Sequence, residues 1–233
     1  MGKMVSFAAN GGTASGYLAE PARAGASDKG APADGRAARG VIVLQEWWGL
    51  NDHVKDVADR FAGAGFPAQA PDLYHGTVTK SPDEAGKLLM ALNIGQAEKD
   101  LRGAVQHLRG LTGRSVGVVG FCMGGALSLF AACKNGKDIG ACVIYYGGHP
   151  KVDFDFDKLT APVLGLWAEH DDFANANAAK IEAALKQRGK RYDGHRYPGT
   201  RHAFFNDTRP EVYNEAAARQ SWDRMLAFFD THL

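Results

Sequence analysis

The feature that most constrains the fold of this chain is an alternation of two patterns that begins at residue 41. Short strand-like runs alternate with segments whose apolar residues recur every three or four positions. The strand-like runs are residues 41–45, 67–70, 116–120, 141–146, 163–168 and 192–197, and the helical segments are residues 54–61, 85–92, 101–108, 123 onward, 177–187 and 222–229. Strands and helices in this order form a mostly parallel sheet with helices on both faces. The sequence therefore predicts an α/β fold with such a sheet at its centre.

The N-terminal segment has a different pattern. Asn-Gly-Gly at residues 10–12 stands between two apolar segments, 5–9 and 13–18, which is typical of a hairpin turn. We therefore expect an antiparallel pair of strands at one edge of the sheet. Residues 21–40 are rich in Ala, Gly, Pro and charged residues without periodicity, and they favour a solvated loop. Because neither segment indicates a second core, we expect residues 1–233 to form a single domain.

Composition and charge exclude several classes of partner. The chain is 45% hydrophobic, its formal net charge is +1, and no long run of Lys and Arg interrupts it. We therefore expect a small-molecule partner rather than a nucleic acid or an anionic membrane. No export-like segment and no apolar stretch of about 20 residues is visible, so we expect a cytoplasmic protein without a membrane span. The three cysteines are an odd number, which predicts free thiols.

One of these cysteines stands at a predicted strand-to-helix turn. Gly120-Phe121-Cys122-Met123-Gly124 fits the nucleophile elbow G-x-S-x-G with sulfur in place of oxygen. The glycines relieve crowding in a strained turn that projects the central side chain above the sheet. The helix that begins at Met123 also directs its free backbone N–H groups and the positive end of its dipole toward the sulfur. The pattern therefore predicts an activated thiol at Cys122.

Two other interpretations of the cysteines were weighed. Free cysteines are usually buried apolar side chains, and we adopt this interpretation for Cys133 and Cys142, which lie in a predicted helix and a predicted strand. A dinucleotide-binding turn would read G-x-G-x-x-G, but Cys122 occupies the place of the glycine that lets the backbone approach a pyrophosphate. We therefore expect no bound cofactor. A nicotinamide-dependent reductase with a Rossmann-like fold is the alternative function.

A thiol nucleophile needs a base, and after such an elbow the acid and then the histidine follow along the chain. His202 follows the predicted strand 192–197, in a loop that can reach the elbow, whereas His195 lies within that strand and is explained as a sheet-face residue. His202 is therefore the candidate base.

The candidate acids follow the strand 163–168, at the same edge of the predicted sheet. They are Glu169, Asp171 and Asp172, and we expect one of the two adjacent aspartates to cap the next helix instead. His170 lies among these carboxylates, but contiguous residues rarely converge on one ion, so no metal site is expected.

At this point the residues resemble those of the dienelactone hydrolase family, the carboxymethylenebutenolidases with an α/β-hydrolase fold. The resemblance extends from residue 41 to the C-terminus through QEWWGLN, APDLY, GFCMGGAL, YYG, HDDF and RHAFF, and the combination is more specific than any one segment. It implies an α/β-hydrolase fold and a triad of Cys122, His202 and Asp171. Asp171 is matched rather than Asp172 because it precedes the Asp-Phe step in the family's register.

The same resemblance implies a role for Glu46. In such enzymes the glutamate of Q-E-x-x-G contacts the resting thiol until substrate displaces it; the alternative for Glu46 is a solvated or capping carboxylate. The resemblance also implies an oxyanion hole made of the backbone N–H groups of Trp47 and Met123. Trp47 and Trp48 would wall the pocket, with aromatic packing as the alternative.

The chain departs from the family at two positions. Members that act on dienelactone hold its carboxylate with arginines, where this chain has Gly76 and Asn206. Lys80 and Arg201 lie near these positions, but a lysine ammonium does not reproduce a planar bidentate clamp. The departure argues against dienelactone itself as the substrate.

The expected function follows from these residues. They predict a cysteine-dependent hydrolase of lactones or activated carboxylic esters that works through a thioester, in a monomer or a small homo-oligomer. Tyr74, Tyr145 and Asn206 are candidate substrate-binding residues, with core packing as the equal alternative for the two tyrosines. A non-catalytic α/β-hydrolase scaffold is a further alternative, and it would tolerate loss of the triad.

Overall fold

The computed structural model describes residues 2–22 and 39–233, and these residues contain one mixed sheet of eight strands. The strands lie in the order β1-β2-β4-β3-β5-β6-β7-β8, and all neighbours from β4 to β8 are parallel, while β2 is antiparallel to both β1 and β4. The strands are β1 (Lys3–Ala9), β2 (Gly12–Ala19), β3 (Val41–Leu44), β4 (Ala68–Pro71), β5 (Val116–Phe121), β6 (Ile139–Tyr145), β7 (Val163–His170) and β8 (Tyr192–Arg201). The predicted α/β fold with a mostly parallel sheet is confirmed.

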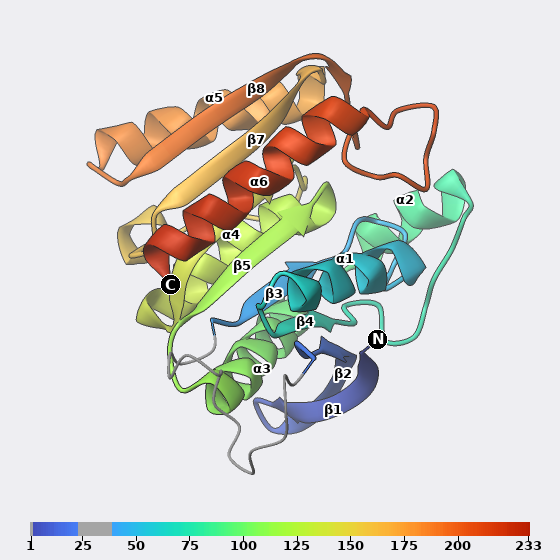
Figure 1. The fold of residues 1–233 in the computed structure, drawn as a ribbon, viewed down its shortest axis with the longest axis vertical. Helices are drawn as coiled ribbons and strands as arrows, with labels where there is room; N and C mark the ends of the chain where they lie inside the picture. Colours follow the sequence, from blue (N-terminus) through green and yellow to red (C-terminus); the bar gives the residue numbers. More distant parts are fainter. Residues whose placement is uncertain (1, 23–38) are drawn as a thin grey trace.

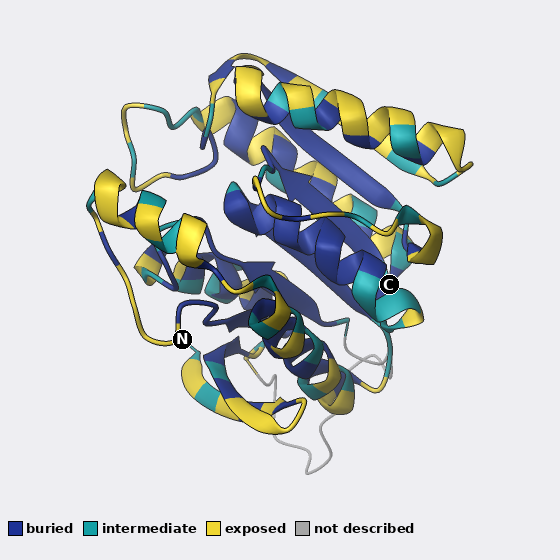
Figure 2. Cartoon of the chain, turned by 180° about the vertical axis from the view of Figure 1, so that it is seen from behind, coloured by how far each residue is buried: buried dark blue, intermediate teal, exposed yellow. Residues whose placement is uncertain are grey.

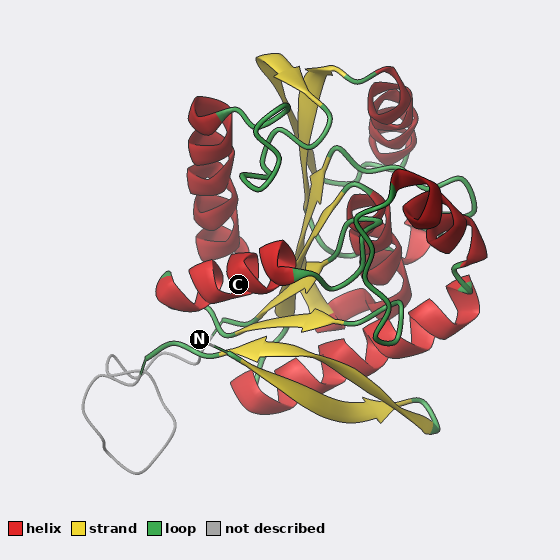
Figure 3. Cartoon of the chain, turned by 90° about the vertical axis from the view of Figure 1, so that its right-hand side faces the viewer, coloured by secondary structure: helices red, strands yellow, loops and turns green. Residues whose placement is uncertain are grey.

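Helices cover both faces of this sheet. They are α1 (Asp52–Gly63), α2 (Pro82–Ala91), α3 (Ile94–Thr112), α4 (Met123–Asn135), α5 (Asp172–Gln187) and α6 (Glu215–His232), with 3-10 turns η1 (Gly136–Asp138) and η2 (Phe156–Lys158). Helices α1 and α6 lie on one face, where Phe61 and Trp222 bring ring centroids within 4.7 Å, and α3, α4 and α5 lie on the other (Figures 1 and 3). No helix in the described ranges is both long and apolar enough to cross a bilayer.

The N-terminal hairpin forms as the Asn-Gly-Gly pattern predicts. Asn10 and Gly11 make the turn with φ of 46° and 96°, the left-handed conformations that a two-residue hairpin turn requires. Strands β1 and β2 pair in an antiparallel register, and β1 forms an edge of the sheet. Most of the predicted loop at residues 21–40 lies outside the described residues.

Helix α4 lies at the centre of the molecule. Every residue from Met123 to Cys133 is buried, and Figure 2 shows this helix as a buried element between more exposed ones. Because α4 starts directly after the central strand β5, its N-terminus is held in the middle of the carboxyl edge of the sheet. Reactive groups of open parallel sheets belong at this edge.

Two elements differ from their predicted bounds. Helix α5 begins at Asp172, five residues before the predicted start, because the side chain of Asp171 accepts a hydrogen bond from the Ala174 N–H and so caps the helix. Strand β8 continues to Arg201, since Arg201 still pairs with His170 of β7 beyond an irregularity in the register. His202 is therefore the first residue after a strand rather than part of a longer loop.

Candidate active site

The turn between β5 and α4 holds Cys122 in a strained backbone conformation. Cys122 has φ of 55° and ψ of −118°, in the region of positive φ that non-glycine residues rarely adopt. Its N–H donates to the Tyr145 carbonyl at 3.1 Å. A Cβ at Gly120 would lie 1.9 Å from the Gly124 carbonyl oxygen, and one at Gly124 would lie 2.4 Å from the Leu44 oxygen. The two glycines of the elbow are therefore required by backbone contacts.

The structure brings His202 and Asp171 together at the carboxyl ends of β8 and β7. The Nδ1 atom of His202 lies 2.5 Å from Oδ2 of Asp171, and Oδ1 of Asp171 accepts from the Ala174 N–H at 3.1 Å. The Asp171 side chain is only 6% exposed, so this carboxylate is oriented by two hydrogen bonds in a buried position. The pair has the geometry of a histidine held in one tautomer by a carboxylate.

The histidine is shifted toward its charged form. Burial lowers the pKa of His202, but hydrogen bonding to Asp171 and to Cys122 outweighs burial and raises the pKa to about 10. Cys122, the residue after β5, contributes to this shift as a hydrogen-bonding group and as a nearby charge. Cys122, His202 and Asp171 thus lie at the carboxyl ends of parallel strands, at the same edge of the sheet, although Cys122 and His202 are 80 positions apart.

The other two candidate acids point elsewhere. Asp172 is exposed as the first residue of α5, and the exposed Glu169 accepts a hydrogen bond from the Gly199 N–H at 2.7 Å. His170 lies 3.5 Å from Glu169 at the surface. Of the three carboxylates that the sequence offered, Asp171 is therefore the one that meets His202.

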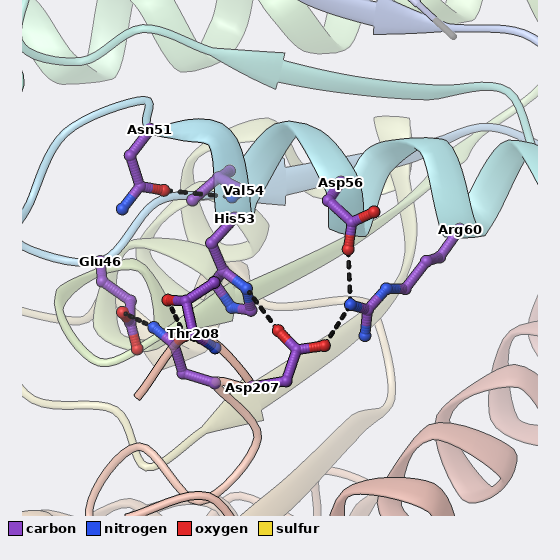
Figure 4. A network of polar contacts seen from close by, with 9 residues as sticks. Glu46, Asn51, His53, Val54, Asp56, Arg60, Asp207 and Thr208 are labelled. Carbon is purple, nitrogen blue, oxygen red and sulfur yellow. Dashed lines mark hydrogen bonds and ion pairs between the residues drawn. The ribbon is translucent and has the colours of Figure 1, made fainter. Parts of the chain in front are cut away.

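Glu46 is a buried carboxylate at the end of β3, and only 2% of it is exposed. Its Oε2 accepts a hydrogen bond from Nδ2 of Asn206 at 2.8 Å, and its Oε1 has no hydrogen-bond partner among the described residues (Figure 4). Contact with the resting thiol was expected, but the structure pairs Glu46 with Asn206. The burial argues against the solvated alternative for Glu46.

The burial and the hydrogen bonds of Asn206 do not match the substrate-binding role that was expected for it. It is 1% exposed, and its Oδ1 accepts from both the N–H and the hydroxyl of Thr208, at 3.1 and 2.6 Å. Both ends of its amide are therefore occupied by protein groups. Asn206 is therefore a buried residue that binds the Glu46 carboxylate and is not open to solvent.

The two predicted oxyanion-hole residues follow β3 and β5, which are parallel neighbours in the sheet. Met123 is the first residue of α4, so its N–H has no acceptor within the helix. Trp47 follows Glu46 in the turn after β3, where the Gly49 N–H donates to the Glu46 carbonyl at 3.4 Å. The half-buried rings of Trp47 and Trp48 contact edge to face with centroids 5.0 Å apart.

The two tyrosines occupy different places. Tyr74 donates its hydroxyl to Sδ of Met123 at 3.2 Å and lines a cavity of about 320 Å³ next to α2 and the start of α3. Burial, followed by the nearby Cys122, raises the pKa of Tyr74, so its hydroxyl stays protonated. Tyr145 is fully buried and stacks on Phe121 with centroids 4.7 Å apart, which favours the packing alternative.

Sequence reasoning missed a residue that contacts the histidine. Tyr146 has φ of 38°, is fully buried, and brings its ring centroid within 5.1 Å of His202. Burial, with Glu46 as the next cause, raises the pKa of Tyr146 well above its usual value. Tyr146 sits at the end of a strand beside a second tyrosine, and the pattern alone could not tell which of the two faces the site.

Comparison with known proteins agrees with this fold. The model of the family described as "Dienelactone hydrolase family" matches residues 28–233. Protein usf of Aquifex pyrophilus is 36% identical, and a protein of Aquifex aeolicus named "Putative carboxymethylenebutenolidase" is 31% identical, each alignment covering 100% of both chains. The crystal structure called "Putative Dienelactone Hydrolase" from Klebsiella pneumoniae superposes with a TM-score of 0.85 at 27% identity, covering 100% of this chain and 99% of that one.

A family match that spans most of the chain and relatives above 30% identity over the full length lead to the same conclusion as the elbow and its parallel sheet. The chain belongs to the dienelactone hydrolase family, and it is a hydrolase with the α/β-hydrolase fold.

Proposed function

We propose that this protein hydrolyses lactones or activated carboxylic esters with Cys122 as nucleophile, His202 as general base and acid, and Asp171 as the group that orients the histidine. The observation that carries the proposal is the convergence of the three side chains at one edge of the sheet, with 2.5 Å between His202 and Asp171. An isolated surface cysteine would need neither the strained backbone nor an oriented histidine.

In the first half of the reaction the Cys122 thiolate attacks the carbonyl carbon while the imidazolium of His202 holds the proton. The developing oxyanion is stabilised by the backbone N–H groups of Trp47 and Met123. The C–O bond then breaks, a thioester forms, and the enolate or alkoxide takes the proton from His202. The raised pKa of His202 supports this step, because it keeps the proton available until charge develops on the leaving oxygen.

The second half releases the product. The now neutral His202 removes a proton from water, which attacks the thioester, and the thiolate leaves with the proton retained on His202 as imidazolium. A carboxylic acid departs as its carboxylate after losing its proton to solvent. Asp171 keeps Nδ1 of the ring occupied throughout, so that Nε2 serves both steps.

The surroundings of Glu46 support an uncharged substrate. Glu46 is buried next to the site, its partner Asn206 is neutral, and Gly76 and Asn206 offer no cation where an anionic substrate would need one. A second carboxylate brought in by substrate would be repelled by Glu46 in a medium of low dielectric. We therefore expect neutral lactones and esters to react better than lactones that carry a carboxylate.

Trapping the acyl-enzyme tests this function. The protein is mixed with 4-nitrophenyl butyrate, quenched in acid within the first turnovers, digested, and mapped by mass spectrometry. We expect a butyryl group on the peptide that contains Cys122 and none on the peptides that contain Cys133 or Cys142. A stopped-flow burst of 4-nitrophenol first establishes that an acyl-enzyme accumulates before the quench. Ester hydrolysis that shows this burst but leaves no acyl group on Cys122 contradicts the mechanism.

A further inference from the structure

A polar network lies beside the site and joins helix α1 to the loop that carries His202 (Figure 4). Three residues make the direct connection, and we call them the α1 clamp: His53 and Arg60 of α1, and Asp207 of the loop. None of them belongs to the proposed triad. No sequence motif marks them.

Asp207 uses both carboxylate oxygens in the clamp. Its Oδ1 lies 3.3 Å from Nδ1 of His53, and its Oδ2 binds Nη2 of Arg60. The same guanidinium nitrogen lies 2.5 Å from Oδ2 of Asp56, one turn earlier on α1. Neither ring nitrogen of His53 makes a hydrogen bond within the described residues, so His53 contacts Asp207 through proximity of the two polar groups, while Arg60 is bonded to it directly.

The loop connects these contacts of Asp207 to the proposed reacting groups. Asn206, the residue before Asp207, donates to Glu46, so two consecutive residues are bound to two different segments of the protein. Toward His202 the loop is closed by a hydrogen bond from the Asn206 N–H to the Ala203 carbonyl at 2.9 Å, and Ala203 itself has φ of 66°. A short turn with a strained residue leaves little freedom between the anchor and the imidazole.

The burial of His53 shows that the clamp is more than a surface ion pair. The His53 side chain is 2% exposed, whereas Arg60 and Asp207 are 38% and 30% exposed. Exposed ion pairs contribute little to stability, but a buried imidazole has lost its hydration and needs a protein partner. Within the described residues both ring nitrogens of His53 lack a hydrogen bond, and the Asp207 carboxylate, 3.3 Å from Nδ1, is the polar group that the ring contacts.

Four charged groups face His53. They are Glu46 from the loop after β3, Asp207 from the loop after β8, and Asp56 and Arg60 from α1 itself. Burial lowers the pKa of His53, and the carboxylates Glu46 and Asp207 only partly oppose this. At neutral pH the ring is therefore uncharged, and it lies between two segments that carry site residues.

We propose that the α1 clamp positions the catalytic groups: by holding the loop on α1 it fixes the imidazole of His202 and, through Asn206, the carboxylate of Glu46. This inference rests on the function proposed above, because the position of His202 matters only if that ring moves protons for Cys122. His53, Arg60 and Asp207 are positioning residues and touch no reacting atom.

Three variants and one matched control test the clamp. Asp207→Asn removes the charge that binds α1, His53→Leu removes the polar ring that faces Asp207 while filling the buried space, and His53→Gln supplies a neutral polar group in its place. Asp138→Asn is the control, because Asp138 pairs with Arg109 at 2.8 Å with side-chain exposures of 34% and 40%, close to those of Asp207 and Arg60, and η1 follows the C-terminal end of α4, away from the elbow.

For Asp207→Asn and His53→Leu we expect kcat on 4-nitrophenyl butyrate to fall about tenfold with KM changed less than about twofold, since a small misplacement of a catalytic group acts on the chemical step. His53→Gln should recover most of the lost kcat, and Asp138→Asn should stay within about twofold of the wild type. A purely structural contact would not give this split or this rescue.

Two measurements that need no ester distinguish failure of the clamp from failure of the proposed function. Hydrogen exchange of the peptide that spans residues 202–208 should be faster in Asp207→Asn and His53→Leu than in the wild type. In the same two variants the rate at which iodoacetamide labels Cys122 at pH 6.5, divided by the rate at pH 9, should fall about fivefold, because the imidazolium no longer faces the sulfur. If the wild type itself shows no acyl-enzyme, the function fails, and the exchange measurement still judges the clamp. The proposal is overturned if Asp207→Asn and His53→Leu show the same exchange rate, labelling ratio and kcat as the wild type and Asp138→Asn.

Discussion

The two ends of helix α4 present the same functional group in opposite settings. At the N-terminal end Cys122 has a backbone φ of 55°, is partly exposed, and faces the imidazole of His202. Near the C-terminal end Cys133 is helical and 1% exposed, and burial, with Asp155 as the next cause, raises the pKa of Cys133 to about 12. One thiol faces an oriented histidine, and the other is enclosed by the protein interior, which disfavours its anion.

The difference shows that position in the fold, rather than the thiol itself, decides its chemistry. Cys142 supports this conclusion, because it is fully buried in β6 and contacts the Ser128 hydroxyl at 3.8 Å. Burial raises the pKa of Cys142 as well. A turn at a helix N-terminus, with an oriented histidine within reach, is the setting that the two buried thiols lack.

The largest expected effect comes from deleting each thiol in turn. Cys122→Ala should lower kcat/KM for short aryl esters by about a thousandfold or more, because the nucleophile is lost, while Cys133→Ala should change it less than about threefold. Steady-state kinetics with 4-nitrophenyl acetate measure both. Circular dichroism is the control for an intact fold.

A Cys122→Ala variant that keeps its activity would remove the proposed nucleophile. Equal losses in the two variants would also remove the distinction between the two ends of the helix, since Cys133→Ala only vacates a small buried volume.

Replacing sulfur by oxygen sharpens the same comparison with a smaller effect. Cys122→Ser should lower kcat/KM by about a hundredfold, because a serine hydroxyl is far less acidic than a thiol and the surroundings are arranged for a thiolate. Cys133→Ser should leave kcat/KM nearly unchanged and instead lower the melting temperature, since it places a hydroxyl in an apolar helix contact. Activity of Cys122→Ser at the wild-type level would show that thiol acidity does not matter at this turn.

The fold was predictable because its signals are local. The period of the apolar residues separated strands from helices, and the Asn-Gly turn at Asn10 located the hairpin, since few residues adopt positive φ there. The early start of α5 was missed, because a cap at Asp171 depends on its side-chain orientation. The extension of β8 to Arg201 was missed because it depends on pairing with a distant strand.

The site was predictable only where a local turn or a chain order specifies it. The elbow placed Cys122, and the sequence order placed His202 after the last strand; the resemblance selected Asp171 among three carboxylates. The partner of Glu46 could not be predicted, because Glu46 and Asn206 are 160 positions apart and meet only through the tertiary fold. For the same reason nothing in the sequence connected His53 with Asp207.

Backbone strain gives a prediction of opposite sign at the two cysteine positions. Relative to the alanine variants, Cys122→Gly should be more stable by about 1 kcal/mol, because glycine tolerates φ of 55° without a Cβ clash. Cys133→Gly should be less stable than Cys133→Ala by about 1 kcal/mol, since glycine is unfavourable inside a helix. Urea unfolding of the four variants measures both differences, and the same sign at both positions would show that the elbow is not strained.

The smallest expected effect is the pH dependence of stability that the protonation of His202 causes. The pKa of His202 is raised in the folded protein to about 10, above its ordinary value of 6.5, so its protonation contributes stability that is fully present below about pH 6.5 and is lost as the pH rises through about 10. The melting temperature of the wild type should therefore exceed that of His202→Gln by about 1 to 2 °C more at pH 6 than at pH 10.5, a small difference because 37% of the ring is exposed and solvent screens the pair. Scanning calorimetry of both proteins at the two pH values measures this difference. Cys133→Ala is the control, because it leaves His202 unchanged and its melting temperature should differ from that of the wild type by the same amount at both pH values. A wild-type advantage that grows toward high pH would mean that His202 is neutral in the resting enzyme, and then Cys122 would lack the charged partner that sets it apart from Cys133.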